Sequence, residues 1–322
     1  MAVETAPATV EDPRPPGLRE RAYAAWDSDL GRRFRRSPLA MAAASVALGL
    51  CLAALLAPLF APQNPFDAAS LDLMNGFSRP MAPNEFTGEV FLMGADDQGR
   101  DVFSTILYGL RISLFVGVMA IGLAALLGVS LGLLAGFVGG WVDAVVMRIA
   151  DVQLTFPSIM IAMLIFGVLK GVTPVESRDE MAIWVLILAI GLSEWVQFAR
   201  TVRGAAMVER EKEYVAAARL AGRGSLAIMF RHVLPNVLGP VLVIATIGLA
   251  LAIIAEATLS YLGVGAPPTE PSLGTLIRVG QNYLFNGEWW ILAFPSVTLL
   301  LLALSVNLLG DWLRDALNPR LR

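Results

Sequence analysis

Four charged side chains within or beside long apolar stretches are the first candidates for chemistry in this sequence. Arg148 and Asp151 share one stretch, and Glu194 and Glu256 each lie in another. A charge in lipid costs about 2.5 kcal/mol or more, so these residues should face a protein interior or a water-filled cavity. The three-residue spacing predicts that Arg148 and Asp151 pair with each other. All four are candidates for lining a pathway, with a structural role as the alternative; for Glu256 a structural hydrogen bond near the outer face is favoured.

The sequence lacks the common patterns of catalysis. It contains no phosphate-binding G-x-x-x-x-G-K-[ST], no H-E-x-x-H, no G-x-S-x-G and no cysteine cluster. His232 is the only histidine, and no serine or cysteine close to it in the sequence suggests a nucleophile. Cys51 is the only cysteine, which excludes an intramolecular disulfide. We therefore expect no enzymatic activity, no metal site and no cofactor bound by this chain.

The elements that carry these residues are membrane helices. The 322 residues are 56% hydrophobic and 16% charged, whereas soluble proteins have about 25% charged residues. Apolar runs of about 18 to 26 residues match the thickness of a bilayer as helices and are too long and continuous for barrel strands. The sequence thus predicts an all-α membrane protein with six transmembrane helices. The predicted spans are residues 39–61, 113–138, 145–169, 182–199, 237–262 and 289–310.

Basic residues predict the orientation of the chain. Arginines are concentrated at residues 31–36, 200–231 and 314–322, and loops rich in Lys and Arg stay in the cytoplasm. Both termini should then be cytoplasmic, and the acidic, proline-interrupted segment 62–111 should form an extracytoplasmic cap. The predicted regions are a cytoplasmic tail (1–36), the first transmembrane helix with the cap (37–112), a five-helix core (113–310) that includes the cytoplasmic loop 200–236, and a cytoplasmic tail (311–322).

A regular glycine spacing in the second predicted span indicates where helices meet. Gly128, Gly132 and Gly136 recur every four residues and so share one helix face. Glycine has no side chain, so this face predicts a close approach of a second helix.

The segment between the fourth and fifth spans has the pattern of a docking element. Tyr214, Ala218 and Ala221, with Val215 beside them, form a small apolar stripe at helical spacing. Gly222 should end this helix, because a left-handed cap costs glycine little. A second short helix should follow, with Leu226, Met229 and Phe230 on one face, and Pro235 suits the first turn of the next span. We expect a short amphipathic helix parallel to the membrane that inserts into a groove of a partner, with an ordinary surface loop as the alternative.

This segment resembles the EAA loop of ABC-importer permeases, E-A-A-x3-G-x9-I-x-L-P. The matching residues are Ala216-Ala217-Ala218, Gly222 and Leu234-Pro235, with Ala216 replacing the glutamate and His232 replacing the isoleucine. Other blocks resemble the dipeptide/oligopeptide/nickel branch of that family, and its C-type subunit most closely. These blocks are residues 94–101, 108–114, 139–157, 230–236, 259–263 and 307–315, so the resemblance extends from about residue 32 to the end.

The resemblance implies a half-permease with the type I ABC-importer fold in a bacterial inner membrane. It implies pairing with a homologous B-type permease, two cytoplasmic ATPases that bind ATP and Mg²⁺, and a substrate-binding protein that docks on the cap; nucleic acid is not among the expected partners. The residues that it assigns to ATPase docking are Tyr214, Ala216, Ala217, Ala218, Arg219, Gly222, Leu234 and Pro235.

The cargo is left open by the sequence. Dipeptides or oligopeptides are the expectation, and glutathione-like peptides and nickel chelates are alternatives within the same family. A stand-alone ion-coupled carrier is the competing class, although the sequence shows no pair of inverted halves with matching broken helices.

Overall fold

The computed structural model describes residues 29–67, 71–267 and 269–317, which are largely helical. Two isolated bridges, Pro83–Val90 and Ala95–Asp101, are the only strand-like pairings in this part of the chain. Of the predicted tails, residues 1–28 and 318–322 lie outside the described residues, whereas residues 311–317 continue the last membrane helix. The helices are α2 (Asp29–Arg35), α3 (Pro38–Leu55), α4 (Ala57–Phe60), α5 (Val102–Val138), α6 (Gly140–Leu154), α7 (Ser158–Val172), α8 (Arg178–Glu209), α9 (Glu213–Leu220), α10 (Ser225–Ile228), α11 (Leu234–Tyr261), α12 (Leu273–Tyr283) and α13 (Trp290–Leu317).

Within the described residues, five helical stretches are long and apolar enough to cross a membrane. They are Pro38–Leu55, Val102–Val138, Val175–Glu209, Ser225–Tyr261 and Trp290–Leu317. The second of these begins at Val102 rather than at the predicted Ser113, because the Asp101 carboxylate caps the helix by accepting hydrogen bonds from the backbone of Phe103 and Ser104. The all-helical prediction is therefore confirmed. The first predicted span, residues 39–61, is shorter as a helix, because α3 ends at Leu55 and Pro58, which lacks a backbone N–H, lies in the first turn of the separate α4.

The third predicted span, residues 145–169, is not one straight helix. The chain forms α6 and α7 instead, and the two are bent by 97° at the break between them. Pro157 lies in that break, where proline lacks the backbone N–H of a continuing helix and disfavours helical geometry at the residue before it. The count reaches the predicted six only when this bent pair is taken as one span.

The glycine face of α5 packs directly against α8, as the spacing predicts. A Cβ atom built on Gly132 would lie 2.4 Å from the carbonyl oxygen of Ala199, and one built on Gly136 would lie 2.6 Å from that of Arg203. At Gly128 the nearest atoms, 2.4 Å away, belong to Phe198 and Trp195. Only glycine permits this separation of the two backbones, so the ridge fixes how α5 and α8 meet.

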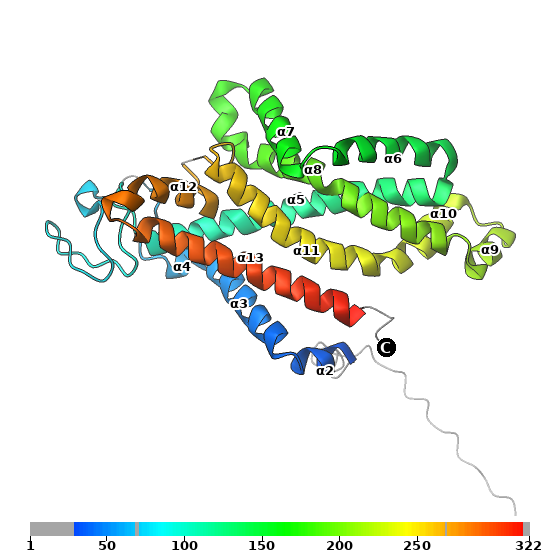
Figure 1. Cartoon of the computed structure of the whole chain (residues 1–322), viewed down its shortest axis with the longest axis horizontal. Coiled ribbons are helices and arrows are strands. Elements are labelled where there is room, and N and C mark those ends of the chain that lie inside the picture. Colours follow the sequence, from blue (N-terminus) through cyan, green and yellow to red (C-terminus); the bar gives the residue numbers. More distant parts are fainter. Residues whose placement is uncertain (1–28, 68–70, 268, 318–322) are drawn as a thin grey trace, which may run out of the picture.

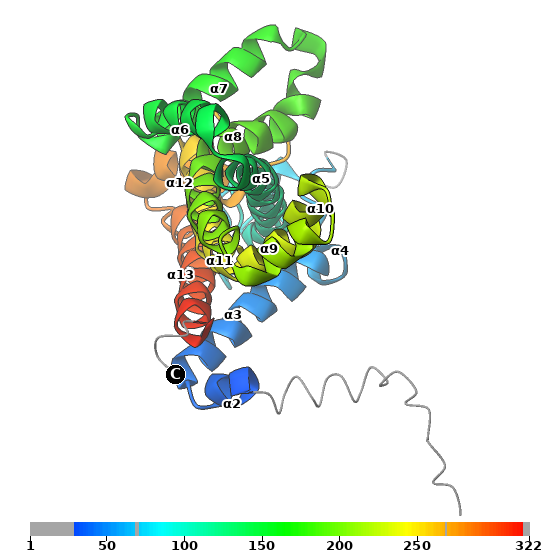
Figure 2. The same cartoon turned by 90° about the vertical axis from the view of Figure 1, so that its right-hand side faces the viewer.

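The remaining helices surround this pair along one long axis. The cap (residues 62–67 and 71–101) and α12 lie at one end, and α9 and α10 lie at the other (Figure 1). An apolar cluster that includes Ile253, Leu273 and Leu302 packs α5, α11, α12 and α13 together. Viewed along the axis, α3 and α7 project on opposite sides of the bundle (Figure 2). The short α2 is held to α13 by an edge-to-face contact between Phe34 and Trp312, whose ring centroids are 5.1 Å apart.

Candidate functional site

The connection between α8 and α11, taken together with the first residues of α11 (residues 210–236), forms a compact unit at one end of the bundle. It consists of α9, a turn at Gly222, the short α10 and a five-residue π-helix, Met229–Val233, that runs directly into α11. Gly222 has a φ of +73°, which is the left-handed cap that its position predicted. We call this unit the α8–α11 segment.

One face of the α8–α11 segment is buried against the protein. Val215 and Ala218 of α9 are buried, as are Ile228, Met229 and Val233 farther along. These side chains belong to the same apolar cluster as residues of α5 and α8. The predicted stripe is correct for Val215 and Ala218 and wrong for Ala221, which is exposed. Ala218, expected at the docking surface, therefore packs inward.

Polar contacts fasten α9 to the helices on both sides of it. The Tyr214 hydroxyl donates to the Glu209 carboxylate at the end of α8, at 2.5 Å. The Asn236 amide at the start of α11 donates to the Tyr214 oxygen at 3.0 Å and to the backbone carbonyl of His232 at 2.9 Å. Burial, and then the hydrogen bond to Glu209, raise the pKa of the Tyr214 phenol above its ordinary value. Because α9 is tied to α8 and α11 at once, a displacement of α9 is transmitted to two membrane helices.

The opposite face of the α8–α11 segment is exposed and partly apolar. Ala216, Ala217, Gly222 and Pro235 are exposed there, while Leu234 is half-buried. Arg219 is also exposed, but its guanidinium lies over the Phe137 ring of α5, with Cζ 5.8 Å from the ring centroid.

Leu220, Leu226 and Phe230 are also exposed, to 91%, 66% and 58%. Leu226, Met229 and Phe230 are predicted on one helix face; of the three, Met229 is buried and the other two are exposed. The sequence analysis did not assign these three large side chains to a docking surface. The sequence feature that could have identified them is that they are large apolar residues within a basic segment. Three large exposed apolar side chains are typical of a surface that a partner covers.

Ion pairs connect α6 to α8 near this end. Arg203 donates from Nε and Nη2 to the two carboxylate oxygens of Asp143, with Nη2 2.6 Å from Oδ2. Asp151 pairs with Arg200 of α8. The predicted pair of Arg148 with Asp151 is therefore wrong, because the packing of α6 beside α8 offers Asp151 a cation from another helix. These contacts hold α6 against α8, which is a structural role for Asp151; a pathway role for Arg148 or Asp151 stays a prediction.

Glu256 is fully buried and accepts two serine hydrogen bonds. The hydroxyl of Ser113 in α5 donates to Oε2 at 2.7 Å, and that of Ser260 in α11 donates to Oε1 at 2.7 Å. The backbone N–H of Leu273 in α12 in turn donates to Ser113 Oγ at 3.3 Å. Glu256 thus joins three helices, which is the structural alternative that its sequence context favoured.

Glu194 has a different environment. It is half-buried and lines a small cavity of about 70 Å³ with Gln197, between α5, α8 and α11. A pathway role for this residue stays a prediction.

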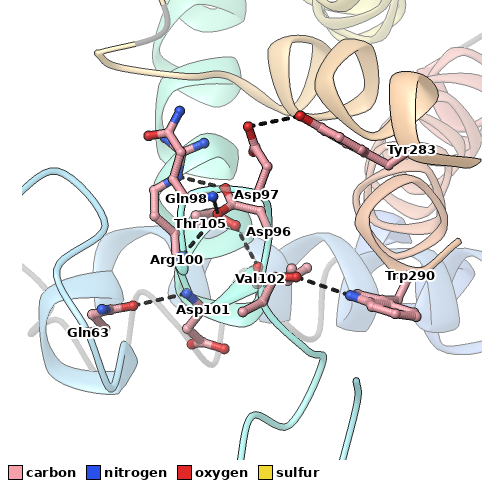
Figure 3. A network of polar contacts seen from close by, with 11 residues as sticks. Gln63, Asp96, Asp97, Gln98, Arg100, Asp101, Val102, Thr105, Tyr283 and Trp290 are labelled. Carbon is pink, nitrogen blue, oxygen red and sulfur yellow. Dashed lines mark hydrogen bonds and ion pairs between the residues drawn. The ribbon is translucent and has the colours of Figure 1, made fainter. Parts of the chain in front are cut away.

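The cap at the other end of the bundle is closed by a buried ion pair (Figure 3). Asp96 accepts from Arg100 Nε at 2.6 Å and from the backbone N–H groups of Gln98 and Arg100 at 2.9 and 3.0 Å. Burial raises the pKa of the Asp96 carboxyl, and the Arg100 guanidinium opposes that rise. The 2.6 Å contact between Arg100 and Asp96 is that of an ionised pair.

Three further contacts anchor the cap to the helices (Figure 3). Tyr283 of α12 donates to Asp97 Oδ2 at 3.1 Å, and Trp290 of α13 donates from Nε1 to the carbonyl of Ala95 at 3.2 Å. Gln63 accepts from the backbone N–H of Asp101 at 3.0 Å. The cap is therefore a folded platform on α5, α12 and α13.

Comparisons with known proteins place this architecture in a family. Residues 128–322 match the model of the binding-protein-dependent transport system inner membrane component, and residues 26–80 match that of the N-terminal transmembrane domain of oligopeptide transport permease C.

Individual relatives agree with these matches. A dipeptide transport system permease protein of Haemophilus influenzae is 36% identical over 85% of this chain and 88% of its own length. An oligopeptide permease of Bacillus subtilis is 35% identical over 95% and 93%, and a glutathione permease of Pectobacterium atrosepticum is 33% identical over 95% of each chain. The chain belongs to the family of binding-protein-dependent transport system inner membrane components: it is a multi-pass inner-membrane permease of the ABC-transporter class, and not itself an enzyme.

Proposed function

We propose that this chain is the C-type half of an ATP-driven importer of dipeptides or oligopeptides. The family match defines a permease that works with a binding protein. Relatives named for dipeptide and oligopeptide transport align with most of the chain, and the glutathione permease shows that cargo differs among similar sequences. The observation that carries the proposal is the exposed face of the α8–α11 segment, fastened to two membrane helices.

In this proposal the segment receives force from a cytoplasmic ATPase. The exposed Ala216, Ala217 and Gly222, with Leu220 and Leu226, would enter a groove on that partner. Ala216 replaces the glutamate of the family pattern, so docking here rests on apolar contact and on Arg219. Tyr214, Ala218, Leu234 and Pro235 would support this surface from behind or beside it.

The remaining partners follow from the same reasoning. A homologous B-type permease would complete the pathway, and two ATPases would bind ATP and Mg²⁺. The binding protein would deliver cargo at the cap, which places the cap outside the cell and the chain termini inside. ATP binding would shift the population between inward-open and outward-open states, and the α8–α11 segment would transmit that shift to α8 and α11.

The test compares Gly222→Asp with Gly222→Asn in cells that make the complete transporter. Gly222 has a positive φ, and no atom lies within 4 Å of its built Cβ. Asn and Asp tolerate this conformation about equally, so the pair isolates the effect of a charge on the docking face. We expect Gly222→Asp to insert normally but to lower uptake of labelled di- and tripeptides about tenfold, with Gly222→Asn near wild type. Normal uptake by Gly222→Asp would refute the coupling role.

Site-specific cross-linking checks the docking geometry directly. Cys51 is the only cysteine, so a Cys51→Ser background carrying Leu220→Cys presents one reactive thiol at a position that is 91% exposed. We expect it to cross-link to the ATPase, whereas Leu59→Cys, 79% exposed near the cap end, should not. Gradient-driven uptake by the purified chain without any partner would instead favour the stand-alone carrier.

A further inference from the structure

We propose that a cavity between α3, α5 and the start of α8 binds a glycerophospholipid whose headgroup carries a primary ammonium, such as phosphatidylethanolamine. The cavity has a volume of about 1020 Å³, at the upper end of the range for small-molecule sites. It lies far from the α8–α11 segment, toward the end of the bundle that carries the cap. Its lining changes from charged to apolar in the way that a phospholipid does.

The cavity extends inward from the membrane boundary. On α5 its wall runs from Tyr108 to Val118, a rise of about 15 Å at 1.5 Å per residue. On α3 the wall is Cys51, Ala54 and Leu55. Both stretches belong to helices long and apolar enough to span a membrane. A ligand that fills this space therefore has an apolar part of considerable length.

Charged side chains lie at the rim of the same cavity. They are Arg111, Asp179, Glu180 and Glu270. Within the described residues, none of the four has a hydrogen-bond or ion-pair partner for its side chain. All four residues are exposed, so one guanidinium and three carboxylates that line the cavity are accessible to a ligand and are not paired within the described part of this chain. Such a set suits a ligand that carries an anion and a cation close together.

The chemistry of these four groups selects among phospholipid headgroups. Arg111 can bind a phosphate through several N–H donors. The carboxylates need N–H donors, which a primary ammonium has and the trimethylammonium of phosphatidylcholine lacks. Phosphatidylglycerol carries a single negative charge, which one arginine would attract and three carboxylates would repel. Phosphatidylethanolamine satisfies both kinds of group.

The apolar part of the cavity distinguishes a lipid from a peptide cargo. A short peptide also carries an ammonium and a carboxylate. A dipeptide extends only about 7 Å, less than the rise of about 10.5 Å from Arg111 to Val118, and a longer peptide would place backbone N–H and C=O groups against this apolar wall without partners. Aromatic rings flank the cavity, with Phe66 against Tyr108 at 5.2 Å and Phe115 against Trp184 at 5.9 Å between centroids. Aromatic side chains are enriched at membrane interfaces, and this position favours the lipid.

The experiment measures lipid binding to the complete transporter purified with its partner subunits. After delipidation, native mass spectrometry follows titration with phosphatidylethanolamine, phosphatidylcholine or phosphatidylglycerol. We expect wild type to bind phosphatidylethanolamine about tenfold more tightly than phosphatidylcholine, the effect of a charge-assisted hydrogen bond. Asp179→Asn, Glu180→Gln and Glu270→Gln combined should abolish that preference. Arg111→Gln should weaken both lipids about equally, since both carry the phosphate.

Matched variants lie just outside the cavity. Glu176→Gln and Arg178→Gln change the same residue types at the same end of α8, and neither residue lines this cavity; both should bind lipid as wild type does. Equal affinity of the wild type for the two lipids, or an equal loss in Arg178→Gln, would overturn the proposal. Displacement of the lipid by di- or tripeptides would make the cavity a cargo site. If no lipid binds and Arg111 instead cross-links to the partner permease, the cavity is a contact between subunits. Either of these last two results, peptide displacement or subunit cross-linking, excludes the lipid site.

Discussion

The glycine ridge of α5 allows a sharp test of what holds the bundle together. In the Gly132→Ala variant the new methyl group would lie 2.4 Å from the Ala199 carbonyl oxygen and 2.9 Å from its Cα atom. Ordinary van der Waals contact begins at 3.4 Å, so the shortfall is about 1 Å. Both neighbouring atoms belong to the backbone of α8 and cannot rotate away, so the helices must separate.

The expected cost follows from this geometry. Overpacking by one methyl group costs about 1–3 kcal/mol in well-packed interiors. In a membrane the contacts between helices carry much of the stability, because lipid is as apolar as the side chains. Alanine regains up to about 1 kcal/mol of helix propensity, which offsets part of the loss. We expect Gly132→Ala to lower the free energy of unfolding by about 2 kcal/mol and to reduce uptake, since α8 carries the α8–α11 segment.

The assay is equilibrium unfolding of the purified protein in mixed micelles of SDS and a mild detergent. Gly122→Ala is the control, because Gly122 lies on the same helix and its built Cβ meets nothing within 4 Å. It should be as stable as wild type or slightly more so. If Gly132→Ala unfolds at the same midpoint as Gly122→Ala, the close approach of α5 and α8 is not what the structure indicates, and the reasoning fails.

Three other predictions use the same unfolding assay. Glu256→Leu should cost about 2–4 kcal/mol because two buried serine hydroxyls lose their acceptor, and Glu256→Gln, which keeps one acceptor oxygen, should cost less; equal costs would contradict this. Tyr214→Phe should cost about 1 kcal/mol. The pKa of Tyr214 is raised in the folded state, so the stability from its hydrogen bond is complete below the ordinary pKa of 10.0 and is lost as pH rises through the folded-state pKa. The difference in unfolding free energy between Tyr214→Phe and wild type should therefore shrink at that high pH. A difference that stays constant with pH would argue against the hydrogen bond. Asp143→Asn should cost under about 1 kcal/mol, because the Arg203 pair is partly exposed, and a larger loss would indicate a desolvated pair.

Much of this protein can be predicted from its sequence because the controlling patterns are local. Apolar runs long enough to span a bilayer mark the helices. Gly222 ends α9 because the residue itself tolerates a positive φ. The four-residue spacing from Gly128 to Gly136 places all three glycines on one face, whatever helix packs against it.

Other features are decided only when distant parts of the chain meet. Asp151 pairs with Arg200 rather than with the nearer Arg148 because α6 packs beside α8. Glu256 finds a serine of α5 at a sequence separation of 143 residues. On α9, helical spacing marks one apolar stripe, and contact with α5 and α8 decides that this stripe packs inward, so that Ala218 is buried and Leu220 is exposed. Sequence thus determined which segments are helices, since that depends on neighbouring residues. Tertiary structure decided which side chains pair and which face is left for a partner, since those depend on the helices that lie alongside.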